Sequence, residues 1–315
     1  MKRVACLGVL AIFGLSVTVA TYEARQERAS LIVRDIDTNL YMLANAPSVQ
    51  GMGGGGNTAI FETADGVVLV DTKIKGYGAD ILAAVRGITD KPVTTIINTH
   101  THWDHTGTNN EFPDTVNFVV HENTRAHMAS QACDDGAGFD GGSIKNCNEF
   151  KGANERFLPG TTYTDTLTLF SGPDQIDLYH FGRGHTDGDT FVVFRAAKTM
   201  HTGDMFQRLG IPFIDVPNSN GSATEFGDTL AKAVAGIPDV DTVIPGHNPV
   251  PVTWNDFVAF SRFYNDIVSR TQKGKAAGRS VDEIVSAYSL PAAYSQFSAP
   301  ERSLRATVQY IFDGR

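Results

Sequence analysis

The hexapeptide HTHWDH, residues 100–105, is the most informative segment of this 315-residue chain. It places four potential metal ligands within six residues, directly after VTTIIN, a β-branched run typical of a strand. Because side chains alternate along an extended chain, His100 and His102 point the same way and can share one cation. The chain then turns into a helix, from which Asp104 and His105 can reach a second cation beside the first.

Three further candidate ligands follow, each just beyond a segment that predicts a strand. His185 lies in FGRGHTDGDT, Asp204 in HTGDM and His247 in VIPGH. Each residue alone is weak evidence for a metal ligand, but the three in this order after the hexapeptide are strong evidence for a metal site. Imidazole and carboxylate ligands suit zinc. Two such cations would lower the pKa of a shared water towards neutrality and make it a nucleophile.

Strand and helix signals alternate around these residues. LIVRDI and NLYMLA predict a strand pair within residues 30–50, TAIFET and VVLVD predict two more strands joined by a turn at Asp65-Gly66, and GADILAAVRGI predicts a helix. SATEFGDTLAKAVAGI predicts a second helix, capped by Ser222, followed by a strand over 241–244. Residues 251–315 read as three helices. The glycine-rich run GMGGGGN, 51–57, is interpreted as a mobile flap, with a phosphate cradle as the weaker alternative because a strand follows it.

These motifs and their order resemble the metallo-β-lactamase superfamily of hydrolases over residues 30–250. The resemblance implies an α/β fold, a four-layer αβ/βα sandwich with the site at one edge, extended here by C-terminal helices. It implies two metal ions, usually Zn²⁺. The implied ligands are His100, His102 and His185 for the first ion, Asp104, His105 and His247 for the second, and Asp204 as a bridge. Asp104 and Asp204 are the implied catalytic carboxylates, and Asp71 is a candidate acceptor for the N–H of a ligand histidine.

Charge and the first twenty residues indicate the setting. The formal net charge is −9, and no basic face is evident, which argues against nucleic acid as a partner and favours a small-molecule substrate. Lys2 and Arg3 precede an apolar run that ends in small residues, which predicts a signal peptide over 1–20, with an uncleaved anchor as the alternative. The remainder, 21–315, would be one periplasmic or secreted domain without stable membrane insertion. In that setting Cys133 and Cys147 are expected to pair as a disulfide rather than stay free thiols.

Superfamily membership leaves the reaction open. Secreted zinc β-lactamases of this family usually carry Cys or Ser where this chain has Asp204, whereas Asp resembles the glyoxalase-type and lactonase-type members. The expectation is therefore a dinuclear zinc hydrolase that attacks a small ester, lactone, thioester or amide carbonyl. The alternatives are a β-lactamase proper, a mononuclear iron dioxygenase of the same fold, and a zinc-binding protein without catalysis.

Other residues receive weaker interpretations. The loop over 214–221 is expected to border the cleft, and Asn218 or Asn220 could donate to a developing oxyanion. Trp103 could form a wall of the site, and residues 133–147 could act as a lid, although an ordinary surface-loop role suits each equally well. Core or supporting roles are expected for the remaining histidines of the mature chain, which are His121, His127, His180 and His201.

Overall fold

The computed structural model describes residues 30–46, 53–130 and 149–315. Two facing β-sheets form its centre. The first has the strand order β1-β2-β3-β4-β5-β6-β7, antiparallel from β1 to β4 and parallel from β4 to β7. Its strands are β1 (Leu31–Asp37), β2 (Leu40–Asn45), β3 (Thr58–Glu62), β4 (Val67–Val70), β5 (Val93–Ile97), β6 (Asn117–His121) and β7 (Thr161–Tyr163).

The second sheet has the order β13-β12-β11-β10-β9-β8, in which only β11 and β12 run parallel. Its strands are β8 (Thr166–Leu169), β9 (Ile176–Tyr179), β10 (Phe191–Phe194), β11 (Thr199–His201), β12 (Thr242–Ile244) and β13 (Val252–Thr253). Apolar side chains from both sheets, including Phe61 and Phe194 with ring centroids 5.1 Å apart, fill the space between them.

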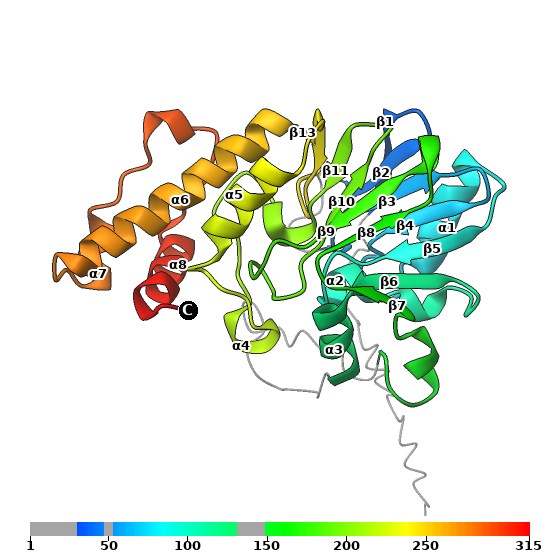
Figure 1. Cartoon of the computed structure of the whole chain (residues 1–315), viewed down its shortest axis with the longest axis horizontal. Helices are drawn as coiled ribbons and strands as arrows, with labels where there is room; N and C mark the ends of the chain where they lie inside the picture. The colour runs from blue at the N-terminus through cyan, green and yellow to red at the C-terminus, as the bar shows by residue number, and fades with distance from the viewer. Residues whose placement is uncertain (1–29, 47–52, 131–148) are drawn as a thin grey trace, which may run out of the picture.

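Helices cover the outer faces of both sheets and complete four layers (Figure 1). The longer helices are α1 (Gly78–Ile88), α3 (Glu122–Ser130), α5 (Phe226–Gly236), α6 (Trp254–Ala276) and α8 (Glu301–Asp313), and the shorter ones α2 (Trp103–Thr106), α4 (Val216–Ser219) and α7 (Val281–Ser286). The helices α1 and α3 pack on the first sheet and α5 and α6 on the second, whereas α8 packs against α6 and α7. This is the predicted αβ/βα sandwich.

Strand β4 shows why a continuous apolar run belongs here. Val68 and Val70 pack between the sheets, whereas Val67 and Leu69 face the helices on the outside. A strand that is buried on both faces has no polar side to alternate with. The predicted run VVLVD therefore marks a central strand of the sandwich.

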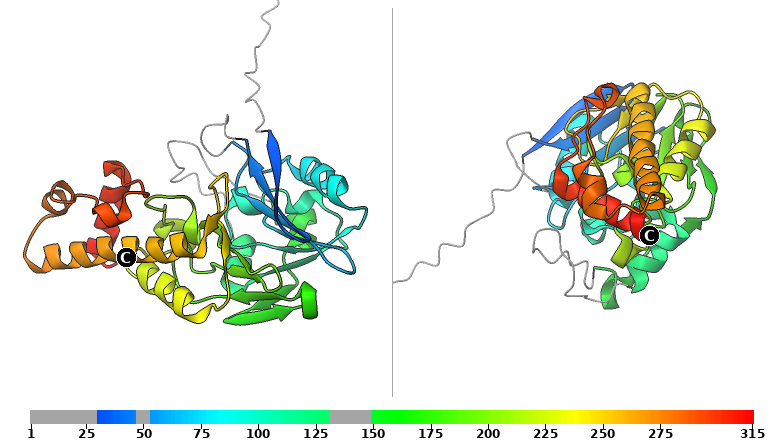
Figure 2. Two further views of the ribbon diagram at one scale, coloured as in Figure 1. Left: turned by 90° about the horizontal axis from the view of Figure 1, so that it is seen from above. Right: turned by 90° about the vertical axis from the view of Figure 1, so that its left-hand side faces the viewer.

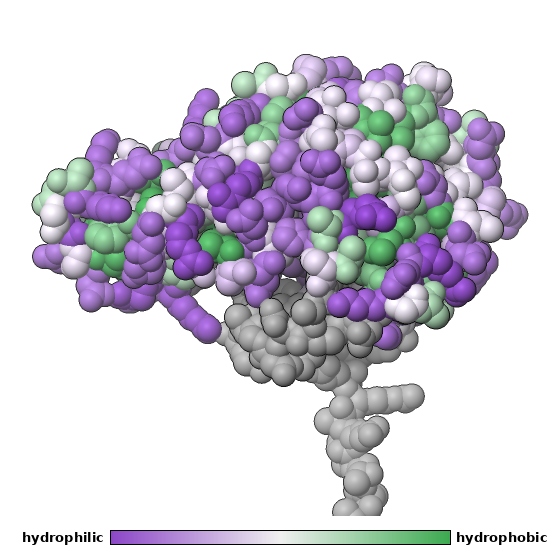
Figure 3. Space-filling model, turned by 60° about the horizontal axis from the view of Figure 1, so that its bottom comes forward, coloured by the Kyte–Doolittle hydropathy of each residue, from purple (hydrophilic) through white to green (hydrophobic). Residues whose placement is uncertain are grey.

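The C-terminal helices extend the second sheet's helical layer. Helix α6 begins with a capping box in which the Thr253 hydroxyl and the Asp256 carboxylate each accept the other residue's backbone N–H. It ends beyond the main body, where α7 and α8 pack beside it (Figure 2). The face turned forward in Figure 3 is largely polar over the described residues, with small scattered apolar areas. In the described part of the chain no helix has the length and apolar character needed to span a membrane.

The second predicted helix is present as α5, and the Ser222 hydroxyl accepts from the Glu225 N–H (3.2 Å) as a cap does, although the regular helix begins at Phe226 after a turn over 223–225. One local prediction was wrong. The glycine-rich run is not a flap where it is described. Residues 54–57 are buried, and Gly56 N–H donates to the Asp104 carbonyl (2.8 Å). The predicted signal peptide over 1–20, the predicted disulfide and lid within residues 133–147, and residues 51–52 lie outside the described residues.

Candidate metal centre

Four polar segments meet at one edge of the sandwich because each follows the end of a strand. Asp71 follows β4, and Thr99 with the hexapeptide follows the parallel neighbour β5. In the second sheet Asp204 follows β11 and His247 follows its parallel neighbour β12. Since parallel strands end at the same edge, segments far apart in sequence come together there.

His100, His102 and His185 form the first cluster. Their ring centroids are 4.6 to 4.7 Å apart, and the ring planes stand nearly perpendicular to one another. His185 Nε2 lies 2.8 Å from His102 Nδ1. One ring nitrogen of each histidine therefore faces a common point, and the three ligand-type atoms lie within 4.8 Å of one another.

The other ring nitrogen of each of these histidines has its own partner. Such outer contacts fix the tautomer and the orientation of a ligand imidazole. The partners are Thr99 Oγ1 for His100 Nδ1 (3.0 Å), Asp215 Oδ2 for His102 Nε2 (2.9 Å) and the Phe213 carbonyl for His185 Nδ1 (2.8 Å). The Asp215 carboxylate is held in turn by the Ser219 hydroxyl (2.8 Å).

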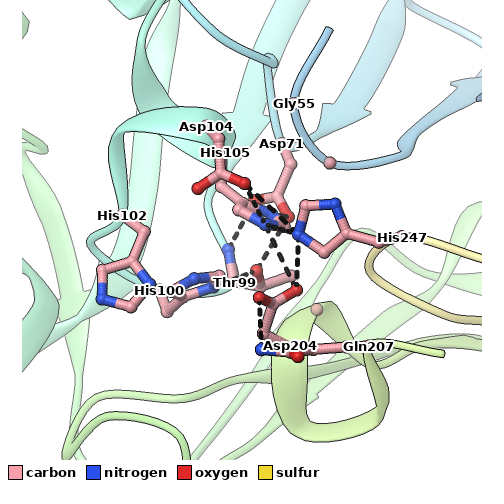
Figure 4. A network of polar contacts seen from close by, with 12 residues as sticks. Gly55, Asp71, Thr99, His100, His102, Asp104, His105, Asp204, Gln207 and His247 are labelled. Atoms are coloured by element: carbon pink, nitrogen blue, oxygen red, sulfur yellow. Dashed lines mark hydrogen bonds and ion pairs between the residues drawn. The ribbon is translucent and has the colours of Figure 1, made fainter. Parts of the chain in front are cut away.

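Asp104, His105 and His247 form the second cluster (Figure 4). His247 Nε2 lies 3.2 Å from Asp104 Oδ2 and 3.2 Å from His105 Nε2. The outer nitrogen of His105, Nδ1, lies 2.6 Å from Asp71 Oδ2. Asp71 also accepts from the Thr99 N–H (2.8 Å) and hydroxyl (2.7 Å), so it is the predicted acceptor for a ligand histidine.

Asp204 lies between the clusters. Its Oδ1 is 3.3 Å from His105 Nε2 and 3.2 Å from His247 Nε2, whereas its Oδ2 is 3.5 Å from His185 Nε2. The Gln207 amide donates to Oδ2 (2.9 Å) and fixes the plane of the carboxylate. Each oxygen therefore addresses a different cluster, which is the arrangement required of a bridging ligand.

The donor set fits metal ions. Among the described residues, six buried side-chain atoms lack a well-formed hydrogen bond, and three of these are His100 Nε2, Asp104 Oδ2 and Asp204 Oδ1. Buried polar atoms without a partner are rare and costly. All three belong to the clusters and face other ligand-type atoms, and cations placed among them would satisfy all three.

The pKa shifts are not uniform within the first cluster, because burial opposes the charge of His102 but the Asp215 carboxylate outweighs it and raises the pKa of His102 above its usual value. Burial lowers the pKa of His100 well below its usual value and that of His185 to about 4, so both are neutral, as a ligand must be. Burial also opposes charge on His105 and His247. There the carboxylates outweigh it, raising the pKa of His105 well above its usual value and that of His247 to about 9.

Several supporting residues were not found from the sequence. Asp215 and Gln207 support a cluster histidine and the bridging carboxylate, but only the folded chain brings them there. Asn218 and Asn220 were proposed as oxyanion donors, yet their amides donate to Asp215 Oδ1 (2.9 Å) and Asp187 Oδ2 (2.9 Å). The structure therefore directs both amides to other partners.

The remaining histidines make contacts away from the clusters. The His121 and His180 rings stack with centroids 4.0 Å apart, and His127 Nε2 lies 2.7 Å from Asp187 Oδ1. His201 Nε2 lies 3.2 Å from the Asn57 carbonyl. These contacts agree with the supporting roles expected for them.

Comparison with known proteins agrees with this architecture. The family model of the metallo-beta-lactamase superfamily matches residues 51–247. No curated protein matches the chain.

Three solved structures of similar fold show low sequence identity to this chain. The metallo-beta-lactamase from Pontibacter korlensis is 18% identical with a TM-score of 0.58, and the match covers 75% of this chain and 99% of that one. The metallo-beta-lactamase DIM-1 is 15% identical with a TM-score of 0.57, over 75% and 98% of the two chains. TMB-1 is also 15% identical, with a TM-score of 0.56 and the same coverage. At such identities the structures support the fold alone, whereas the family match spans more than half of the chain, which therefore belongs to the metallo-β-lactamase superfamily.

Proposed function

We propose that this protein is an exported dinuclear zinc hydrolase that cleaves a small-molecule ester, lactone, thioester or amide. The observation that carries the proposal is the position of Asp204, whose two oxygens address two separate clusters of ligand-type atoms. The export proposal rests on the signal-like residues 1–20 and stands apart from the chemistry.

Each cluster would bind one of the two zinc ions. His100, His102 and His185 would hold one zinc ion, Asp104, His105 and His247 the other, and Asp204 would contact both. Zinc pairs of this kind supply a nucleophile from water and polarise the scissile carbonyl. Asp104 and Asp204, both buried at the junction of the clusters, would accept and orient the proton of the attacking water. Hydrolysis then adds OH to the acyl carbon and H to the departing oxygen, sulfur or nitrogen.

Metal removal and one substitution test this proposal. The purified mature chain should bind two equivalents of zinc, and a strong chelator should abolish hydrolysis until zinc is returned. Asp204→Ala should lose metal and activity, whereas Asp228→Ala, at an exposed position of α5, should keep both. A metal-free preparation with full activity would refute the proposal. A single equivalent of iron together with dioxygen consumption would favour the mononuclear oxygenase alternative.

A β-lactamase is the second candidate, because solved structures of similar fold carry that name. The presence of Asp at position 204 argues for lactones or thioesters instead. A chromogenic cephalosporin, a lactone and a thioester should therefore be offered to the same zinc-loaded preparation. Rapid opening of the cephalosporin would favour the β-lactamase, and turnover of the lactone or thioester alone would favour the lead proposal.

A further inference from the structure

Lys73 is a fully buried lysine beside the second cluster. Its side chain is 0% exposed, and it lies two residues after Asp71 at the end of β4. Lysine is almost never fully buried unless its charge is paired. Burial lowers the pKa of Lys73 to about 7, and the charges of Asp71 and Asp104 oppose that shift. None of the steps proposed above uses this ammonium group.

The Lys73 ammonium holds the described part of the glycine-rich run. Lys73 Nζ donates to the Gly56 carbonyl (2.7 Å) and lies 3.4 Å from Asn45 Oδ1. The Asn45 amide donates to the Gly55 carbonyl (2.7 Å). Asn45 at the end of β2 and Lys73 in the segment after β4 therefore hold the backbone of this loop through hydrogen bonds.

Gly56 and Asn57 of the same segment also contact the residues of the second cluster or their neighbours. The Gly56 N–H donates to the Asp104 carbonyl (2.8 Å), and a Cβ added at Gly56 would lie within 2.8 Å of both ring nitrogens of His105. The Asn57 amide donates to the carbonyls of Pro245 and Asn248, 2.7 Å each, which flank His247. Figure 4 shows Gly55 near Asp71, His105 and His247.

We infer that Lys73 is a positioning residue which, through the backbone of residues 54–57, sets the geometry of the Asp104–His105–His247 cluster and so its affinity for the second metal ion. The first cluster contacts other segments, at Thr99, Phe213 and Asp215, and is not held by this loop. The inference rests on the proposed dinuclear function and adds a residue to it.

Replacing Lys73 by a neutral residue has two opposite expected effects on metal affinity, one from the lost charge and one from the lost hydrogen bonds to the loop. A lysine charge repels a nearby metal ion, so its removal should by Coulomb's law alone tighten metal binding. Loss of the tether instead lets the loop and His105 move, which should weaken binding. Loss of partners that orient ligands typically costs about 10- to 100-fold in metal affinity. The direction of the change therefore separates the two effects.

The test is a titration of metal-free protein with Co²⁺, followed by its visible absorption, with metal content measured independently. Lys73→Met keeps the length of the apolar stem and removes the ammonium. We expect the second equivalent to bind K73M at least about 10-fold more weakly, with the first within twofold of wild type. Lys91→Met is the matched control, because Lys91 Nζ also donates to a backbone carbonyl, that of Thr63 (2.8 Å), at the opposite end of the sheet. K91M should bind both equivalents normally.

Each outcome has a distinct meaning. Second-site binding by K73M that is unchanged or tighter, or equal weakening of both sites, would overturn the inference. A wild-type chain that binds a single equivalent would refute the dinuclear proposal and this inference together. If K73M does not fold, two other variants test the inference. Asn45→Ala removes the hydrogen bond to the Gly55 carbonyl, and Gly56→Ala places a methyl group too close to the His105 ring. Both should weaken the second site selectively, and wild-type binding by both would overturn the inference.

Discussion

Replacing Gly246 by alanine tests the position of Asp204 most directly. A Cβ at residue 246 would overlap Asp204 Oδ1 and would lie 2.8 Å from the Gly203 carbonyl oxygen, inside the 3.0 Å that real Cβ contacts essentially never breach. Gly246 has no positive φ, so alanine suits its backbone and the overlap is the whole effect. The Asp204 carboxylate must therefore move, and the short contact with the Gly203 carbonyl requires a smaller backbone shift as well.

The structure sets the scale of the effect. To escape the overlap, the Asp204 carboxylate must move by on the order of 1 Å, a misplacement that costs about 100-fold in rate when it affects a reacting group. Oδ1 would leave its positions 3.3 Å from His105 and 3.2 Å from His247, so metal shared with the second cluster should bind more weakly as well. We therefore expect G246A to fold, to lose about 100-fold in kcat/KM, and to release one metal equivalent first.

The assay is steady-state hydrolysis of whichever substrate in the panel turns over, with metal content measured on the same samples. Gly87→Ala is the control, because a Cβ at this position of α1 meets no atom within 4 Å. Alanine there should leave activity unchanged and can stabilise the helix by up to about 1 kcal/mol. G246A with two firmly bound metal equivalents and a rate within twofold of wild type would refute the placement of Asp204 as a bridge.

Further predictions concern supporting residues. Asp215→Ala removes the acceptor 2.9 Å from His102 Nε2 and should weaken the first Co²⁺ equivalent by about 10- to 100-fold; normal first-site affinity would show that this contact does not orient the ligand. Burial lowers the pKa of His121 to about 4, below its usual value near 6.5 when unfolded, so the unfolded chain binds the extra proton and stability falls as pH drops through that interval. His121→Gln should flatten the change in urea midpoint between about pH 7 and 5, and equal slopes would contradict this. Phe260→Ala, which removes a ring stacked on Phe206 at 4.4 Å, should cost about 3–5 kcal/mol in urea unfolding while leaving metal stoichiometry intact.

Local sequence patterns determined the elements and the ligand types. VVLVD and VTTIIN predicted β4 and β5 because β-branched apolar runs suit strands buried on both faces. GADILAAVRGI predicted α1, which spans Gly78–Ile88. The spacing within HTHWDH placed His100 and His102 on one side of an extended chain, and both face the first cluster. These conclusions needed only contacts within a few residues, so the sequence could supply them.

Apart from Asp71, which the sequence already suggested as an acceptor for a ligand histidine, the distant groups that support the ligands were decided by the tertiary structure alone. Asp215 is 113 residues from His102, and Lys73 is 17 residues from the Gly56 carbonyl that it holds. No local sequence motif identifies either residue. A hydrogen-bond acceptor or a residue that holds a loop needs only the right distance and orientation in the folded chain, and sequence spacing does not reveal these. The 54–57 segment shows the same limit. Its glycines suggested mobility, whereas in the fold they let the backbone pass close to His105, a space that a larger side chain would fill.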